Sequence, residues 1–119
     1  MNSYELVLPL GPSDNNYYGQ HGHRKYIKPA GVLFRQEVAL AFRLSKMPKL
    51  TGRVCIVARI YPKTKAVTDI LNRAKALCDA LQHAGVFDDD GQIDDAQLIR
   101  GHVVPGGRCE VMIGVFDAP

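Results

Sequence analysis

Tryptophan is absent from the sequence, and cysteine is scarce, with Cys55, Cys78 and Cys109 spread along 119 residues. Because the number of cysteines is odd and none of them forms a CxxC pair, a disulfide framework is not expected. Each cysteine lies within an apolar pattern, which predicts three buried free thiols. Free thiols fit a reducing compartment.

Long apolar runs are also missing. No stretch approaches the roughly 20 apolar residues that a membrane span needs, and the N-terminus lacks the apolar segment of a signal peptide. A cytoplasmic protein with no membrane contact is therefore expected. The Walker A, GxSxG and HExxH motifs and zinc-ligand spacings do not occur, so the sites that they form are not expected either.

Negative charge is scarce in the first half of the chain. Residues 1–65 contain eleven Lys and Arg residues and three acidic residues, a net charge of +8. Residues 66–119 contain four Lys and Arg residues and nine acidic residues, a net charge of −5. This distribution suggests that the basic half binds a polyanion and that the acidic half holds a bound cation or a catalytic acid cluster. The alternative is a solvated surface on which charges cluster by chance.

The hydrophobic patterns predict an α+β fold in a single domain over residues 1–119, with elements in the order β, α, β, α, β, β. Pro29 is well placed to begin the first helix and Gly85 to end the second. A long irregular connection, rich in Pro, Gly, Asn and Ser, is expected over residues 9–25. The expected strands are residues 3–8, 53–61, 92–104 and 108–116, and the expected helices are residues 30–45 and 69–84.

The connection over residues 9–25 interleaves aromatic and basic side chains, as a loop that contacts nucleic acid would. His21 and His23 have no further ligands at useful spacing, so they make a poor metal site. The alternative is a flexible hairpin loop with ordinary polar residues. The interleaved residues are Tyr17, Tyr18, His21, His23, Arg24 and Lys25.

The helix expected over residues 69–84 has one apolar face. Asp69 lies in its first turn, where a negative charge favours the exposed amide groups, and Thr68 is the expected N-cap. Asp69 therefore has a complete structural explanation beside any functional one. The apolar face consists of Ile70, Ala74, Leu77, Cys78, Leu81 and Ala84, and the opposite face of Asn72, Lys75, Asp79, Gln82 and His83.

Asp88, Asp89 and Asp90 follow this helix, and three successive acids repel one another unless they are solvated or share a cation. Mg²⁺ uses one or two carboxylates and keeps several waters for a phosphate. Beside a basic DNA-binding surface, such a cluster has the parts for phosphodiester hydrolysis, in which the metal generates a nucleophilic water and Lys75 neutralises the developing charge. The alternative is a solvated acidic turn, with Lys75 and Asp79 as an i,i+4 ion pair.

These segments together resemble the RusA family of Holliday junction resolvases, over nearly the whole chain. The stretch PLGPSDNNYY after the first strand is similar to the family's Pro-Pro-Ser-x-Asn opening. DILNRAKALCDAL and FDDDGQI are similar to the family pattern Asp-x-Asp-Asn-x-x-Lys, Asp-Ala-Leu and then Asp-Asp-x-Gln-Ile or Val. The resemblance implies a mixed sheet with two helices, and a homodimer that binds four-way DNA junctions. It also implies an Mg²⁺-dependent endonuclease that cuts two strands symmetrically in recombination and repair.

Position by position, the resemblance assigns catalysis to Asp69, Lys75 and Asp90, and metal binding to Asp69 and Asp90, with Asp89 as a neighbouring acid that can assist. The middle Asp of the pattern falls on Leu71, which cannot bind Mg²⁺. Leu71 either widens the core contact of the helix or marks the loss of a metal ligand. In the second case the protein is a junction binder with weak or no cleavage. The residues expected to contact DNA are Ser13, Asp14, Asn15, Asn16, Arg24, Lys25, Lys28, Lys63, Lys65, Asn72 and Arg73.

Overall fold

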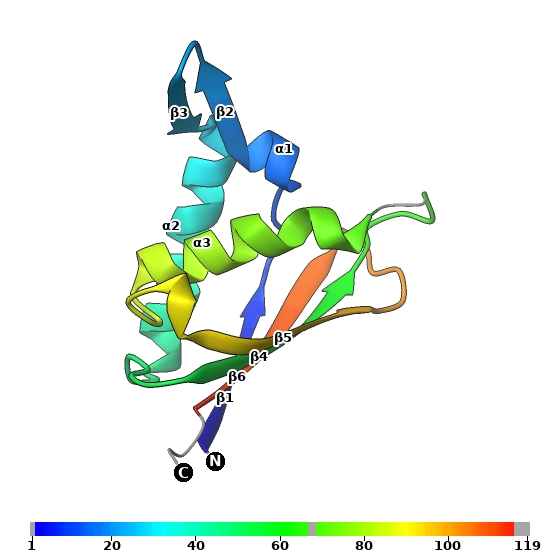
Figure 1. The fold of residues 1–119 in the computed structure, drawn as a ribbon. Coiled ribbons are helices and arrows are strands. Elements are labelled where there is room, and N and C mark those ends of the chain that lie inside the picture. The colour runs from blue at the N-terminus through cyan, green and yellow to red at the C-terminus, as the bar shows by residue number, and fades with distance from the viewer. Residues whose placement is uncertain (1, 67–68, 116–119) are drawn as a thin grey trace.

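Two long helices cover one face of a four-stranded sheet, and a small two-stranded hairpin projects beyond them (Figure 1). This computed structural model describes residues 2–66 and 69–115. The large sheet contains β1 (Asn2–Leu8), β4 (Val54–Tyr61), β5 (Ile93–Arg100) and β6 (Arg108–Val115), and the hairpin contains β2 (Tyr18–His21) and β3 (Arg24–Ile27). The helices are α1 (Asp14–Tyr17), α2 (Pro29–Ser45) and α3 (Ala74–Ala84), with two 3₁₀ turns, η1 (Ile70–Arg73) and η2 (Asp90–Gln92).

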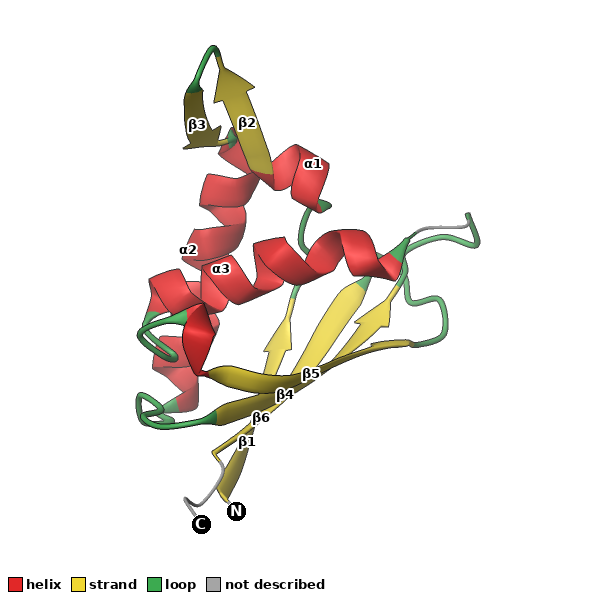
Figure 2. Ribbon diagram, viewed as in Figure 1, coloured by secondary structure: helices red, strands yellow, loops and turns green. Residues whose placement is uncertain are grey.

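The large sheet is mixed, with the strand order β1-β6-β4-β5 (Figure 2). β6 pairs antiparallel with both β1 and β4, whereas β5 pairs parallel with β4. A parallel pair needs a crossover connection, and η1, α3 and η2 supply it between β4 and β5. The predicted α+β class, the order of the main elements and the mixed sheet with two principal helices are therefore confirmed.

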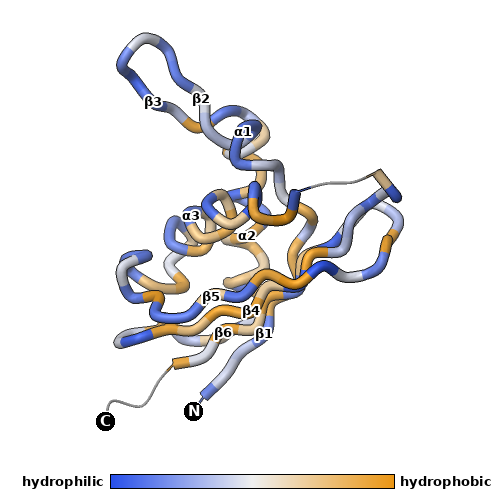
Figure 3. Tube along the Cα trace, turned by 45° about the vertical axis from the view of Figure 1, so that its right-hand side comes forward, coloured by the Kyte–Doolittle hydropathy of each residue, from blue (hydrophilic) through white to orange (hydrophobic). Residues whose placement is uncertain are grey.

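The core lies between the sheet and the two long helices, because side chains alternate between the two faces of each strand. In β4 the side chains of Ile56, Ala58 and Ile60 are buried, whereas Arg59 between them is exposed on the opposite face. Figure 3 shows hydrophobic colour along β4 and hydrophilic colour on the hairpin. The helices contribute Phe34, Val38, Ala76, Leu77, Ala80 and Leu81 to the core.

Most predicted element boundaries agree with the structure to within two residues. β5 is shorter than predicted: the Gly101 N–H donates to the Ile60 carbonyl at the sheet edge, and the chain then leaves toward a turn at Gly106 and Gly107. The three cysteines form no disulfide, as predicted, but only Cys109 is buried, whereas Cys55 and Cys78 are partly buried. Thr68 and Phe116 lie outside the described residues. No helix in the described part of the chain is long and apolar enough to cross a membrane.

The prediction of an irregular connection over residues 9–25 is wrong. Its second half forms the β2–β3 hairpin, and a short helix, α1, precedes it. Gly22 has a φ of 63°, the positive value that a two-residue hairpin turn favours at its first central position. The elements are four residues long, which is too short for hydrophobic periodicity to be visible in the sequence.

The single helix predicted over residues 69–84 is also corrected. The segment begins as the 3₁₀ turn η1, and Asn72, with a ψ of 20°, separates it from α3. The Asp69 carboxylate accepts a hydrogen bond from the Leu71 N–H at 3.0 Å, so the N-cap of the 3₁₀ turn is Asp69, which was predicted to lie in the first turn, and not the predicted Thr68. At the other end Gly85 adopts a φ of 91° and ends α3 as predicted.

One polar network joins α1, α2 and α3. The Tyr17 side chain is fully buried, and its hydroxyl donates to Asp79 Oδ2. Arg35 donates to the same carboxylate oxygen through Nη2 at 2.7 Å and to the Tyr17 hydroxyl through Nε at 2.8 Å. Burial, and then the hydrogen bond to Asp79, raise the pKa of Tyr17 well above its usual value, so the phenol keeps its proton. Asp79 therefore pairs with Arg35, and the alternative pairing with Lys75 is wrong.

Replacing Asp79 by Ala removes the acceptor that Tyr17 and Arg35 share. We expect Asp79→Ala to lower the free energy of unfolding by about 1–3 kcal/mol, because a buried hydroxyl and a partly buried guanidinium lose their partner. Urea unfolding followed by circular dichroism measures this change. Asp94→Ala is the matched control, since it breaks an exposed pair with Arg53 and should have a much smaller effect. If the two variants lost the same free energy of unfolding, the network would stabilise the fold no more than an exposed ion pair does.

Candidate active site

The start of α3 is held in place by a residue distant in sequence. Asp14 of α1 accepts a hydrogen bond from the Ala76 N–H at 2.8 Å, which satisfies one of the exposed amide groups in the first turn of α3. Asp14 was expected to contact DNA, but the structure gives it a capping role. This hydrogen bond brings the segment with Ser13, Asn15 and Asn16 close to the helix that carries Lys75.

The Lys75 side chain projects from the first turn of α3 toward the beginning of β2. Its Nζ lies 5.8 Å from the centre of the Tyr18 ring, within the range of a cation–π contact. Tyr18 is partly buried, and burial, followed by the charges of Asp79 and Asp14, raises its pKa to about 12. The Tyr18 phenol is therefore neutral at physiological pH.

The three consecutive acids behave differently from one another. Asp88 forms an ion pair with Lys49. The Asp89 carboxylate accepts from the Gly91 N–H at 2.9 Å and caps η2, and this hydrogen bond, followed by one with Asp90, lowers its pKa. The Asp90 N–H donates to Gln82 Oε1 at 3.0 Å, which fixes the backbone of η2 against α3. Asp88 and Asp89 thus have structural partners in or beside their own loop.

Asp90 and Asp14 approach α3 from two different segments. Burial raises the pKa of the Cys78 thiol to about 11, and the charges of Asp90 and Asp14 add to this shift. Cys78 lies one helical turn beyond Lys75. The hydrogen bond to Gln82 holds the Asp90 backbone beside the second half of α3, whereas Asp14 caps the first turn of the same helix. The grouping of Asp90 with Asp69 and Lys75 in one site stays a prediction.

Leu71 does not widen the core, and this part of the prediction is wrong. Its side chain is 70% exposed, because the 3₁₀ geometry of η1 turns it away from the sheet. Within residues 2–66 and 69–115, no three Asp, Glu, His or Cys side chains form a group that could hold a metal ion. Asp69 and Asp90 remain as the carboxylates of the pattern. Oxygen ligands are of the type that Mg²⁺ takes, and an Mg²⁺ site needs only one or two carboxylates from a protein, with water and phosphate as the other ligands.

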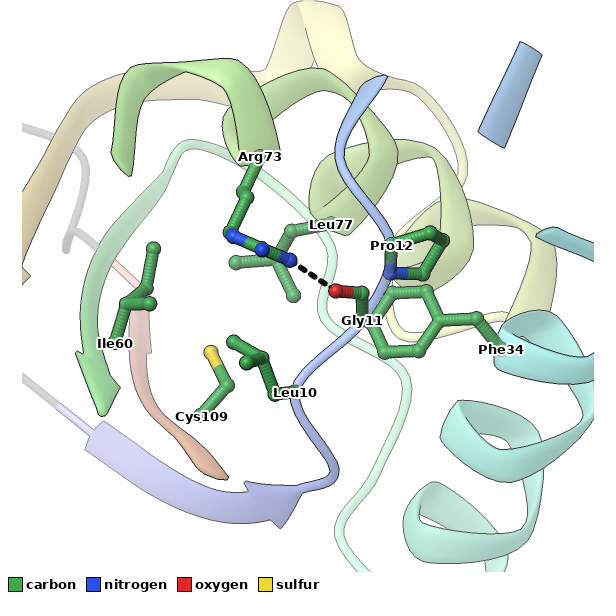
Figure 4. A pocket seen from close by; sticks show the side chains of 8 residues that line it. All are labelled: Leu10, Gly11, Pro12, Phe34, Ile60, Arg73, Leu77 and Cys109. Carbon is green, nitrogen blue, oxygen red and sulfur yellow. Dashed lines mark hydrogen bonds between the residues drawn. The ribbon is translucent and has the colours of Figure 1, made fainter. Parts of the chain in front are cut away.

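Arg73 was expected to contact DNA, but its side chain points inward (Figure 4). Its Nη1 donates to the Gly11 carbonyl, beside a cavity of about 10 Å³ whose other lining residues include Leu10 and Cys109. Burial lowers the pKa of Arg73 and raises that of the Cys109 thiol to about 12. The Phe34 ring lies so close to Gly11 that a Cβ there would come within 2.6 Å of it. Arg73 thus ties η1 to the segment before α1.

An open cleft of about 340 Å³ lies beside Arg73. Ser13 and Asn16 line it together with Lys63, although Lys63 is far away in the sequence. Lys28 is near the same segment, because its Nζ donates to the Asn15 carbonyl at 3.0 Å. The other expected DNA contacts, Arg24 and Lys25 on β3 and Lys65 after β4, are exposed but do not line the cleft.

Arg35 belongs to the Asp79 network behind the start of β2, and the sequence analysis missed it. Its neighbours on α2, Phe34 and Val38, are buried, so a basic residue at this position is close to the core. That proximity was a signal for a buried acidic partner. The sequence alone gives no means of choosing Asp79 from twelve acidic residues.

Comparisons with known proteins identify the family. The model of the endodeoxyribonuclease RusA family matches residues 9–114. The crossover junction endodeoxyribonuclease rusA of Enterobacteria phage HK97 is 38% identical over 121 aligned residues, which cover 99% of both chains. The corresponding proteins of Enterobacteria phage 82 and Escherichia coli strain K12 are 34% and 32% identical over 114 residues, with 95% of both chains covered in each case. This chain belongs to the endodeoxyribonuclease RusA family, which confirms the resemblance.

The inward position of Arg73 can be tested against its expected role on DNA. We expect Arg73→Ala to lower the free energy of unfolding by about 1–3 kcal/mol, because it leaves the Gly11 carbonyl without its donor and enlarges the cavity. Urea unfolding measures the loss, and Arg24→Ala on the exposed hairpin serves as the control. If Arg73→Ala kept full stability and lost only affinity for DNA, the inward role would be refuted.

Proposed function

We propose that this protein is an endonuclease that resolves four-way (Holliday) DNA junctions by paired symmetrical strand cleavage in recombination and repair, with Mg²⁺ as its cofactor. The observation that carries the proposal is that one crossover holds all three residues: Asp69 caps η1, Lys75 lies in the first turn of α3, and Asp90 lies in η2, whose backbone is hydrogen-bonded to α3. The relatives are named crossover junction endodeoxyribonucleases, and enzymes of this kind generally use a divalent metal. Residues 1–119 act as one domain, in the cytoplasm of a bacterial or phage-infected cell.

In this proposal the chain supplies carboxylates and one ammonium group. Asp69 and Asp90 hold the metal, and Asp89 assists them through its contact with Asp90. When bound, Mg²⁺ lowers the pKa of a ligated water and stabilises charge on the phosphate. Lys75 places an ammonium beside the scissile phosphate, where it stabilises the additional negative charge of the transition state.

DNA binding is proposed for the basic surface on both sides of this site. Arg24, Lys25 and Lys28 at the hairpin, and Lys63 and Lys65 after β4, neutralise backbone phosphates. Contacts of this kind position a junction without reading its sequence. The polar residues proposed to hydrogen-bond to the backbone are Ser13, Asn15, Asn16 and Asn72.

A second candidate function is a junction-binding protein of the same fold that cleaves weakly or not at all. The observation in its favour is the exposed Leu71, which offers no oxygen to a metal where the family pattern has an Asp. Both candidates share the same DNA surface. They differ in whether two carboxylates of the pattern are enough for cleavage.

A labelled four-way junction distinguishes these candidates. We expect symmetrical nicks that require Mg²⁺, and we expect Leu71→Asp to increase the cleavage rate by about 10- to 100-fold, because it restores a carboxylate ligand. Gel electrophoresis of the cut strands measures the rate, and a band shift on the same junction measures binding. Leu71→Asn is the matched control, because asparagine is similar in size to aspartate but carries no charge.

Each result decides between the two candidates. Tight binding of the junction without nicks in the wild-type protein, followed by cleavage in Leu71→Asp, would favour the binding protein. Cleavage that survives both Asp69→Asn and Asp90→Asn would refute the proposed site. A linear duplex control shows whether the activity is specific for junctions.

A homodimer is part of the proposal, since symmetrical cleavage of a two-fold junction suits a two-fold protein. We place the second copy on the sheet face that no helix covers. Val7 and Met112 are 58% and 51% exposed there, and Glu5 and Arg59 add both signs of charge to the same face. An apolar centre with both charges around it can complement a second copy of itself.

Met112→Asp should therefore convert the dimer to a monomer, because a charge replaces the apolar centre of the interface. Sedimentation or light scattering at several concentrations measures the mass. Val32→Asp is the control, since Val32 is 43% exposed on α2 and does not line the groove beside Glu5 and Val7. A monomeric wild-type protein, or a dimer unaffected by Met112→Asp, would rule out this interface.

A further inference from the structure

Lys75 carries its charge at an unfavourable place. It is the second residue of α3, and the exposed amide groups of a helix N-terminus give that end a partial positive charge. Within residues 2–66 and 69–115, no carboxylate forms an ion pair with Lys75. The ammonium therefore needs another partner if it is to stay in one position before DNA binds.

The partner that the structure provides is the face of the Tyr18 ring, 5.8 Å from Nζ. The ring is itself fixed: Tyr17 and Tyr18 are in edge-to-face contact, with ring centres 4.6 Å apart and planes at 64°. Tyr17 is fully buried and is held by Asp79 and Arg35. A continuous set of contacts thus runs from the helix network to the Lys75 ammonium.

The neutral state of Tyr18 determines what kind of contact this is. Because burial and nearby negative charge raise its pKa to about 12, the phenol does not become a phenolate that would neutralise Lys75. A neutral ring attracts the ammonium through its quadrupole and leaves the full positive charge available to a phosphate. The contact positions the charge without cancelling it.

We propose that Tyr18 is a positioning residue, whose ring face holds the Lys75 ammonium at the place where it meets the scissile phosphate. The part of this inference that concerns cleavage rests on the proposed function. The competing role for a partly exposed aromatic residue such as Tyr18 is stacking on a base of bound DNA. The two roles make different predictions, because stacking contributes to DNA affinity, whereas positioning of Lys75 contributes to the rate of the bound complex.

The first test needs no activity. Lysines are dimethylated with ¹³C-formaldehyde, which keeps their charge, and the Lys75 methyl signal is assigned by its loss in Lys75→Arg. We expect the Tyr18 ring current to displace this signal from the position of exposed lysines. The displacement should disappear in Tyr18→Leu, persist in Tyr18→Phe, and persist in Tyr26→Leu, which removes another tyrosine of the same hairpin.

The second test uses junction cleavage. Tyr18→Leu should lower kcat by about 3- to 30-fold, with KM and junction affinity nearly unchanged, as expected for loss of a cation–π contact. Tyr18→Phe keeps the ring and should restore the rate. In a Lys75→Met background, Tyr18→Leu should cause no further loss of cleavage.

The outcomes separate this inference from the proposed function. A Lys75 signal that does not move in Tyr18→Leu overturns the inference, and so does a loss of affinity at constant kcat, which would indicate base stacking. If the wild-type protein cuts no junction but the displaced signal responds to Tyr18 as expected, the proposed function fails while the positioning contact stands.

Discussion

The Asp79 carboxylate is the point on which the arrangement of the three helices depends. It accepts from a buried tyrosine of α1 and from an arginine of α2, while it belongs to α3 itself. Such a network contributes little net stability compared with an apolar core, but it allows only one relative position of the groups that it joins. Asp14 adds a second tie between α1 and α3. The hairpin, which begins directly after Tyr17, is thereby fixed relative to the helix start that carries Lys75.

The two oppositely charged halves of the sequence are not two separate surfaces. Several acids of the second half are neutralised by bases of the first: Asp79 by Arg35, Asp88 by Lys49 and Asp94 by Arg53. These pairs explain much of the acidic excess in structural terms. Asp69 and Asp90 take part in none of these pairs, and Lys63 and the hairpin bases likewise remain at the surface. Charge asymmetry in the sequence therefore overestimated how many acidic residues are available to a site, since several of them have structural partners.

The sequence predicted those parts of the fold that depend on apolar periodicity. The buried positions of β4 and the turns of α2 repeat often enough to be recognised, and Gly85 marked a helix end that needs a positive φ. A hairpin was only the alternative for the β2–β3 segment, because its strands are too short to show a periodic pattern. Neither the 3₁₀ turn at residues 70–73 nor the inward direction of Arg73 follows from a local pattern, since both depend on Gly11 and Asp14, which are distant in the sequence. The exposed position of Leu71 is a consequence of that turn.

The strand order also determines when the large sheet can form during synthesis of the chain. β6 lies between β1 and β4 and follows both of them in the sequence, so β1 has no partner in the large sheet until β6 has been made. The crossover that carries Asp69, Lys75 and Asp90 ends at β5, which pairs with β4. Contacts between such distant segments form slowly. A nascent chain that has not yet reached β6 therefore has no continuous sheet beneath these side chains.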